Sequence, residues 1–156
     1  YSGTVAAAIE GVIIGVPAIA MSLAASWPEH ARDHHWATAA EVAQSVGRDV
    51  LAGGLPRYTL LNVNVPNVPF SAVRGTRWTH QARKAYRDRL DRRTDPRGGT
   101  YYWVWGTFDP ATIEDGSDLA AVRDGYVSIT PVTIDRTDPE TLAEHLGEQG
   151  PRAETA

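Results

Sequence analysis

Short apolar runs separated by Gly and Pro open the chain. Residues 5–14 form an apolar run that Gly15 and Pro17 end, which predicts a helix. Residues 18–23 (AIAMSL) are short, apolar and bounded by turn residues, which is typical of a buried strand. The chain therefore begins with a helix followed by a strand.

A second helix and strand follow with a clearer pattern. Apolar side chains recur every three or four positions between residues 36 and 50, and the Gly53-Gly54 pair and Pro56 end the pattern. This spacing predicts an amphipathic helix. Residues 59–65 end in alternating apolar and asparagine positions, which predicts a strand with one buried face. The order helix, strand, helix, strand favours an α/β fold built in layers.

The second half of the chain changes character at residue 74. Nine of the fifteen Lys and Arg residues lie between residues 74 and 97, where three Asp residues oppose them. The sequence DPRGG at 95–99 predicts a turn, and the aromatic run YYWVW at 101–105 predicts a strand. We therefore expect residues 77–105 to form a protruding hairpin arm with an irregular basic middle.

The remaining elements are short. Ser117 or Asp118 caps a helical turn, and residues 126–134 predict a strand in which Pro131 disfavours a central, fully paired position. Pro at the first position of residues 139–146 predicts a last helix.

Length and composition fit one globular domain. The chain has 156 residues, so we expect a single domain over residues 1–147, incomplete at its N-terminus, followed by a flexible tail at 148–156. The chain has no cysteine, which excludes disulfides and thiolate metal sites and fits a cytoplasmic protein. Its net charge of −4 argues against a surface that binds nucleic acid throughout. Residues 12–23 are shorter than the ~20 residues that a membrane-spanning helix needs, so we expect no membrane partner.

The turn Ser2-Gly3-Thr4 before the first helix is the strongest candidate site. The first N–H groups of a helix have no intrahelical partner and suit an anion, above all a phosphate. Gly3 lets a ligand approach closely, and the hydroxyls of Ser2 and Thr4 can donate to phosphate oxygens. The alternative is an ordinary helix cap that binds nothing.

Other polar residues have a functional and a plain interpretation each. Asp33, His34 and His35, with His30 nearby, could bind a metal, but a polar loop leading into a helix is favoured. Asp118 is an acid in a turn, and capping is favoured over catalysis.

The basic arm has three interpretations. It could bind nucleic acid or polyphosphate, it could be a solvated arm, or it could contact other subunits, which is favoured. The aromatic residues of the arm could stack on a base, but packing in a sheet or an interface is favoured. These residues are Tyr101, Tyr102, Trp103 and Trp105.

Three blocks of sequence resemble one known family. They are YSGTVAAAIEG with GVPAIAMSL in residues 1–23, LLNVNVPNVP at 60–69, and DPRGGTYYW at 95–103 with GSDLAAVRDGYVSITPVTID at 116–135. In this order they resemble the SurE family of survival proteins, which are 5′/3′-nucleotidases. The blocks span nearly the whole chain.

The resemblance implies a fold, a reaction and an assembly. The fold is α/β, Rossmann-like and three-layered, with a protruding β-hairpin. The reaction is metal-dependent hydrolysis of nucleoside 5′- and 3′-monophosphates. The hairpin and a swapped C-terminal segment of the family build homodimers or homotetramers.

The chain departs from the family at the metal site. The family's metal ligands are an Asp-Asp pair, a Ser and an Asn that precede the YSGT motif, and none of them lies within this chain. We therefore expect the Mg²⁺ or Mn²⁺ ligands to lie outside it, with Ser2, Gly3 and Thr4 as phosphate contacts and no catalytic residue or metal ligand in the chain. On this basis the chain alone is inactive. The alternatives are a non-catalytic oligomerisation module and a basic-arm binder of nucleic acid or polyphosphate.

Overall fold

A computed structural model describes residues 2–25, 34–83, 87–107 and 113–148. Its centre is a four-stranded sheet in the order β1-β2-β6-β3, and β4 and β5 form a separate two-stranded sheet. The central strands are β1 (Ile19–Ala24), β2 (Thr59–Pro66), β3 (Thr76–Trp78) and β6 (Val127–Thr133). Strands β1 and β2 are parallel, β6 is antiparallel to β2, and the short β3 is parallel to β6.

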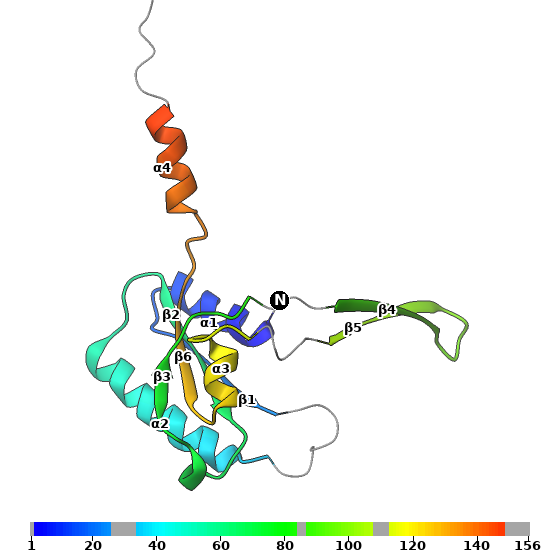
Figure 1. Cartoon of the computed structure of the whole chain (residues 1–156), viewed down its shortest axis with the longest axis horizontal. Coiled ribbons are helices and arrows are strands. Elements are labelled where there is room, and N and C mark those ends of the chain that lie inside the picture. The colour runs from blue at the N-terminus through cyan, green and yellow to red at the C-terminus, as the bar shows by residue number, and fades with distance from the viewer. Residues whose placement is uncertain (1, 26–33, 84–86, 108–112, 149–156) are drawn as a thin grey trace, which may run out of the picture.

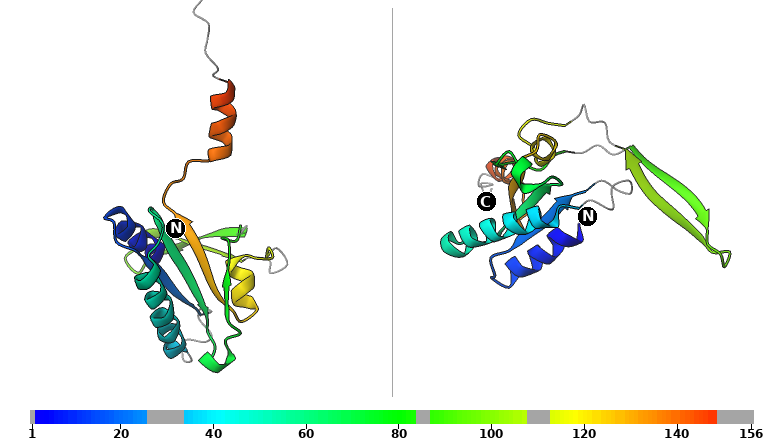
Figure 2. Two further views of the ribbon diagram at one scale, coloured as in Figure 1. Left: turned by 90° about the vertical axis from the view of Figure 1, so that its left-hand side faces the viewer. Right: turned by 90° about the horizontal axis from the view of Figure 1, so that it is seen from below.

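Helices cover both faces of this sheet (Figures 1 and 2). Helix α1 (Gly3–Ile13) packs through Ala8 and Val12 against Ala20 and Leu60. Helix α2 (Trp36–Gly53) packs on the opposite face, because its contacts are the odd-numbered residues of the same strands. The predicted three-layer α/β fold is therefore confirmed.

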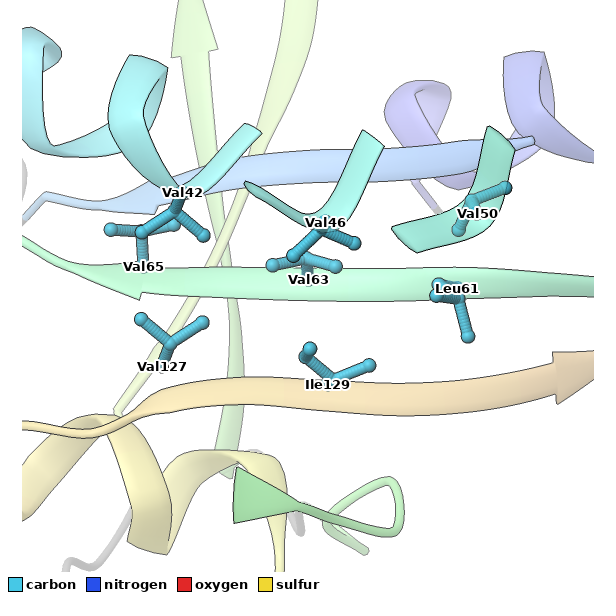
Figure 3. Packing of buried hydrophobic residues seen from close by; sticks show 8 residues of the cluster. All are labelled: Val42, Val46, Val50, Leu61, Val63, Val65, Val127 and Ile129. Atoms are coloured by element: carbon cyan, nitrogen blue, oxygen red, sulfur yellow. The ribbon is translucent and has the colours of Figure 1, made fainter. Parts of the chain in front are cut away.

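The larger hydrophobic core lies between α2 and the sheet (Figure 3). Val42, Val46 and Val50 recur every four residues along α2 and so form one stripe. They face Leu61, Val63 and Val65 of β2 and Val127 and Ile129 of β6. Full burial of one such side chain contributes about 1.5–3 kcal/mol, so this stripe fixes α2 against the centre of the sheet.

Strand β6 lies inside the sheet, between β2 and β3. The sequence disfavoured that position because Pro131 has no N–H to donate. The structure tolerates it because β3 pairs with residues 127–129 only, whereas Pro131 lies opposite Leu61 of β2. The ladder on the β3 side thus ends before it reaches the proline.

The arm is an antiparallel hairpin of β4 (Arg87–Thr94) and β5 (Thr100–Thr107) that projects from the body (Figure 1). In the turn, Asp95 Oδ1 accepts 2.8 Å hydrogen bonds from the N–H groups of Arg97 and Gly99. The hairpin strands differ from the predicted range 77–105. Residues 77 and 78 belong to β3 of the central sheet, and β5 continues to residue 107.

Three short helices complete the fold. Helix α3 (Asp118–Arg123) precedes β6, and η1 (Phe70–Ala72) precedes β3. Helix α4 (Pro139–Glu148) stands away from the sheet and ends two residues later than predicted (Figures 1 and 2). Most of the predicted tail lies outside the described residues. Within the described part of the chain, none of the helices combines the length and the apolar character needed to cross a membrane.

Candidate functional site

Ser2 caps α1. Its backbone is extended (φ −140°, ψ 120°), its Oγ accepts a 3.3 Å hydrogen bond from the N–H of Val5, and its carbonyl accepts one from Ala6. Such a cap stabilises a helix by about 1 kcal/mol. The hydroxyl proton of Ser2 is not used in this bond, because the oxygen acts as the acceptor.

The next two N–H groups are free to bind a ligand. Among the residues that the structure describes, the backbone N–H groups of Gly3 and Thr4 have no hydrogen-bond partner. The first turn of α1 also contains no acidic side chain. Unpaired N–H groups at the positive end of the helix dipole attract an anion. Gly3 and Thr4 therefore have the unpaired N–H groups that a phosphate contact requires, and phosphate binding at this turn stays a prediction.

Gly3 is not required by the fold itself. Its φ is not in the left-handed region, and an added Cβ would meet no other atom within 4 Å. Neither backbone strain nor internal packing therefore explains a glycine at this position. The absence of a side chain leaves room for close approach of a ligand.

The first turn of α1 lies at a favourable edge of the sheet. A short connection joins the end of α1 to the start of β1, so the first turn points toward the carboxyl ends of the parallel strands β1 and β2. Figure 1 shows this turn on the side from which the hairpin projects. Ligands of α/β proteins bind beyond the carboxyl ends of parallel strands.

The sheet face under α1 becomes polar toward that edge. Asn62 and Asn64 of β2 share the face of Leu60, and Ser22 of β1 lies opposite Asn64. Sequence reasoning used the two asparagines only as markers of alternation. Their period-two spacing before Pro66 is the sequence signal that could have placed both asparagines on one face of the strand, near its carboxyl end.

The histidine cluster does not form a metal site among the described residues. His35 precedes α2 without a side-chain capping bond, and the ring of His34 packs edge-on against Trp36 at 5.3 Å. Asp33 and His30 lie outside the described residues. Across the part of the chain that the structure describes, no three His, Asp or Glu side chains are grouped so that they could hold a metal ion.

Of the two candidate caps of α3, Ser117 is the cap and Asp118 is not. The Oγ of Ser117 accepts a 3.2 Å bond from the N–H of Ala120. Half-buried Asp118 instead accepts a 3.0 Å bond from the N–H of Ala82, 36 residues earlier. Asp118 therefore holds the segment through which the chain leaves β3 toward the arm.

Side chains of the arm are well exposed where the structure describes them. Arg93 pairs with Asp91 at 3.7 Å and lies 5.9 Å from the ring centre of Trp103. Tyr102 and Trp103 are more than half exposed. Both rings are therefore open to a binding partner. The side chain of Trp105 lies outside the described part.

A second basic cluster surrounds Tyr126, and sequence reasoning missed it. The guanidinium carbons of Arg77 and Arg74 lie 3.6 and 4.8 Å from the ring centre of Tyr126. A hydrogen bond from Arg123 lowers the pKa of Asp124, and Arg77 adds to this effect from 3.4 Å. This cluster fastens β3 to the start of β6.

Comparison with known proteins identifies one family. Residues 1–88 match the family model described as Survival protein SurE. The chain is 46% identical over 137 residues to the 5′-nucleotidase SurE of Symbiobacterium thermophilum, and 38% identical over 150 residues to that of Fervidobacterium nodosum. These matches cover 88% and 96% of the chain but 52% and 56% of the two relatives. The chain thus spans about half the length of these relatives.

A solved structure gives the same result. The chain superimposes on the crystal structure of the SurE protein from Aquifex aeolicus with a TM-score of 0.75 and 34% sequence identity. The superposition covers 96% of the chain and 58% of that protein. The central sheet, its helices and their order are therefore those of a known fold.

Proposed function

The chain belongs to the SurE family, and from this premise we propose that it provides the phosphate-binding part of a nucleotidase. The substrates are nucleoside 5′- and 3′-monophosphates. The observation that carries the proposal is the pair of unpartnered N–H groups of Gly3 and Thr4 at the start of α1. The names of the relatives, which are 5′-nucleotidases, support the same reaction class.

Ser2, Gly3 and Thr4 bind the phosphate in this proposal. Two backbone N–H groups and the hydroxyls of Ser2 and Thr4 donate hydrogen bonds to its oxygens. The helix dipole adds about 0.3–1 kcal/mol for an exposed anion. These contacts orient the phosphorus atom at the carboxyl edge of the sheet, and the proposal assigns no nucleophile or general base to the residues that the structure describes there.

A divalent cation, Mg²⁺ or Mn²⁺, is the cofactor that the family resemblance implies. Such ions prefer several oxygen ligands, with carboxylates prominent. The described residues near the first turn of α1 do not fit an ion of this kind, because that turn contains no acidic side chain. The ligands in this proposal belong to residues outside these 156, and none of the contacts above depends on the ion.

Replacement of Gly3 by Val tests the phosphate site. The two added methyl groups would occupy the space that the phosphate approaches, so we expect AMP and inorganic phosphate to bind at least about tenfold more weakly, a loss of about 1.4 kcal/mol. Isothermal titration calorimetry measures both affinities.

The chain offers a matched control for this test. Gly47 lies within α2, and an added Cβ there also meets no atom within 4 Å. Gly47→Val should leave both affinities unchanged, because α2 covers the other face of the sheet. Equal affinities of the intact chain and Gly3→Val would contradict the proposed site.

Assembly is a second candidate function. Leu90 and Val104 pair across the hairpin. Because the arm projects from the body, these two apolar side chains are 68% and 67% exposed (Figure 1). Leu142 and Leu146 of α4 are one helical turn apart and are also exposed. Apolar side chains in such positions favour contacts with another subunit. The proposed assembly is a homodimer or homotetramer. The cytoplasmic location of the protein stays a prediction.

A further inference from the structure

A cavity of about 450 Å³ opens beside α1, on the sheet face that α1 covers. Its apolar lining comes from one side of α1 and from the end of β6: Val5, Ile9, Ile13, Val132 and Ile134. Gln81, Thr133 and Arg136 add polar side chains. Small-molecule sites have volumes of roughly 300–1,000 Å³ and combine apolar walls with a few polar groups. The cavity has the size and lining of such a site.

The cavity begins one helical turn along α1 from the proposed phosphate site, at Val5, and extends toward the start of β2. Ser2, Val5 and Ile9 are three and four residues apart, so they lie on one side of α1. At 1.5 Å per residue, Val5 lies about 4.5 Å and Ile9 about 10 Å along the helix from Ser2. A ligand with its phosphate at the first turn can therefore extend over Val5 into the cavity.

Gln81 is held in place by its neighbours. The N–H of Thr79 donates to the carbonyl of Ile129 at 3.0 Å, the N–H of His80 to Gly116 at 3.2 Å, and the N–H of Ala82 to Asp118 at 3.0 Å. These bonds fix the backbone on both sides of Gln81. Within the described residues, the side-chain amide of Gln81 itself has no hydrogen-bond partner.

Arg136 is also available to a ligand. It enters no ion pair among the residues that the structure describes. The neighbouring Asp135 forms no ion pair with Arg136 within the described residues, and its carboxylate accepts a 2.9 Å bond from the N–H of Thr137. That bond also lowers the pKa of Asp135. The cavity thus presents one amide and one guanidinium above an apolar wall.

We infer that this cavity binds the nucleobase of the substrate. A base has flat, largely apolar faces and donor and acceptor groups along its edge. Val5 and Ile9 contact a face of the base, and Gln81 and Arg136 form hydrogen bonds with its edge, which are the roles of Gln and Arg in base recognition. The inference rests on the proposed function, because it assumes a nucleoside monophosphate as the substrate.

The two halves of the site can be tested separately by NMR titration of the whole chain. Adenosine has the base and no phosphate, so it should shift the side-chain amide of Gln81 and the methyl signals of Val5 and Ile9. Inorganic phosphate should shift the amide signals of Gly3 and Thr4. AMP should shift both sets.

Variants of Gln81 sharpen the test. Gln81→Ala should weaken adenosine binding by roughly three- to tenfold, the effect of one or two hydrogen bonds, and leave phosphate binding unchanged. Gln81→Trp should fill the cavity and abolish adenosine binding. Gln44→Ala is the control, because Gln44 lies on α2 and bonds to Arg48.

The outcomes separate the two claims. If phosphate shifts Gly3 and Thr4 while adenosine shifts none of the cavity signals, the base site is wrong and the phosphate site stands. If adenosine shifts the cavity signals and phosphate shifts nothing, the phosphate site is wrong. Adenosine affinity that is equal in Gln81→Trp and the intact chain would also overturn the base site.

Discussion

Gly3 is the residue on which the proposed phosphate site depends most. The glycine has an ordinary backbone conformation and open space around its α-carbon, so the folded chain would accept a side chain there. The sequence identified this position because small residues before a helix are typical of an anion turn. The structure shows that Ser2 caps α1 through its hydroxyl oxygen, and this bond does not use the hydroxyl proton.

Ser117 and Asp118 were equal candidates for the cap of α3. Both residue types are good helix caps, so local sequence could not choose between them. The choice depends on Ala82, whose N–H needs the carboxylate of Asp118. A hydrogen bond between residues 36 positions apart cannot be predicted from the local sequence.

Asp138 gives a pH prediction at this scale. Its carboxylate accepts hydrogen bonds from the side-chain hydroxyl and the N–H of Thr141, which lower its pKa below the ordinary value of 3.8. The stabilisation of α4 is therefore complete above that ordinary pKa and is lost as pH falls through the lowered value. NMR titration of the Glu140 and Thr141 amides should show this transition below pH 3.8.

The matched variant is Asp138→Asn. Asparagine caps a helix but does not titrate, so the acid transition of the Thr141 amide should disappear while α4 remains helical. A transition of the same size and midpoint in Asp138→Asn would contradict the assigned role.

At the scale of elements, periodicity predicted whether a segment is a helix or a strand better than it predicted which strands pair with each other. The valine stripe of α2 and the alternation in β2 gave the right element in the right place. The arm was predicted to begin at residue 77, within the basic stretch that precedes the turn at 95–99 and the aromatic strand at 101–105. Residues 77 and 78 pair with β6 instead, and such a pairing depends on residues 51 positions further along the chain.

Removal of the hairpin tests the assembly function. Replacement of residues 87–107 by a short Gly-Ser linker should reduce the mass measured by light scattering at least twofold, because the exposed apolar pair of the arm is lost. The variant with both Arg92 and Arg93 changed to Gln keeps Leu90 and Val104 and should retain the full mass. An unchanged mass after hairpin removal would exclude the arm as the interface.

At the scale of the whole molecule, the fold was more predictable than the site. The order of helices and strands follows from hydrophobic pattern and turn residues, and the SurE protein from Aquifex aeolicus has the same fold. The phosphate turn could be proposed from the sequence because its three residues are adjacent. The cavity was not, because Val5, Gln81 and Arg136 come from three distant segments that meet only in the folded protein.

The central claim is that this chain binds the phosphate of a nucleotide while the metal-dependent chemistry depends on residues outside it. The most direct measurement is phosphate release from AMP by the purified chain, with Mg²⁺ or Mn²⁺ and with EDTA as the control. We predict binding of AMP without release above the EDTA control. Metal-dependent release by the chain alone would contradict the claim, and Asp33, His34 and His35 would then be the first residues to replace.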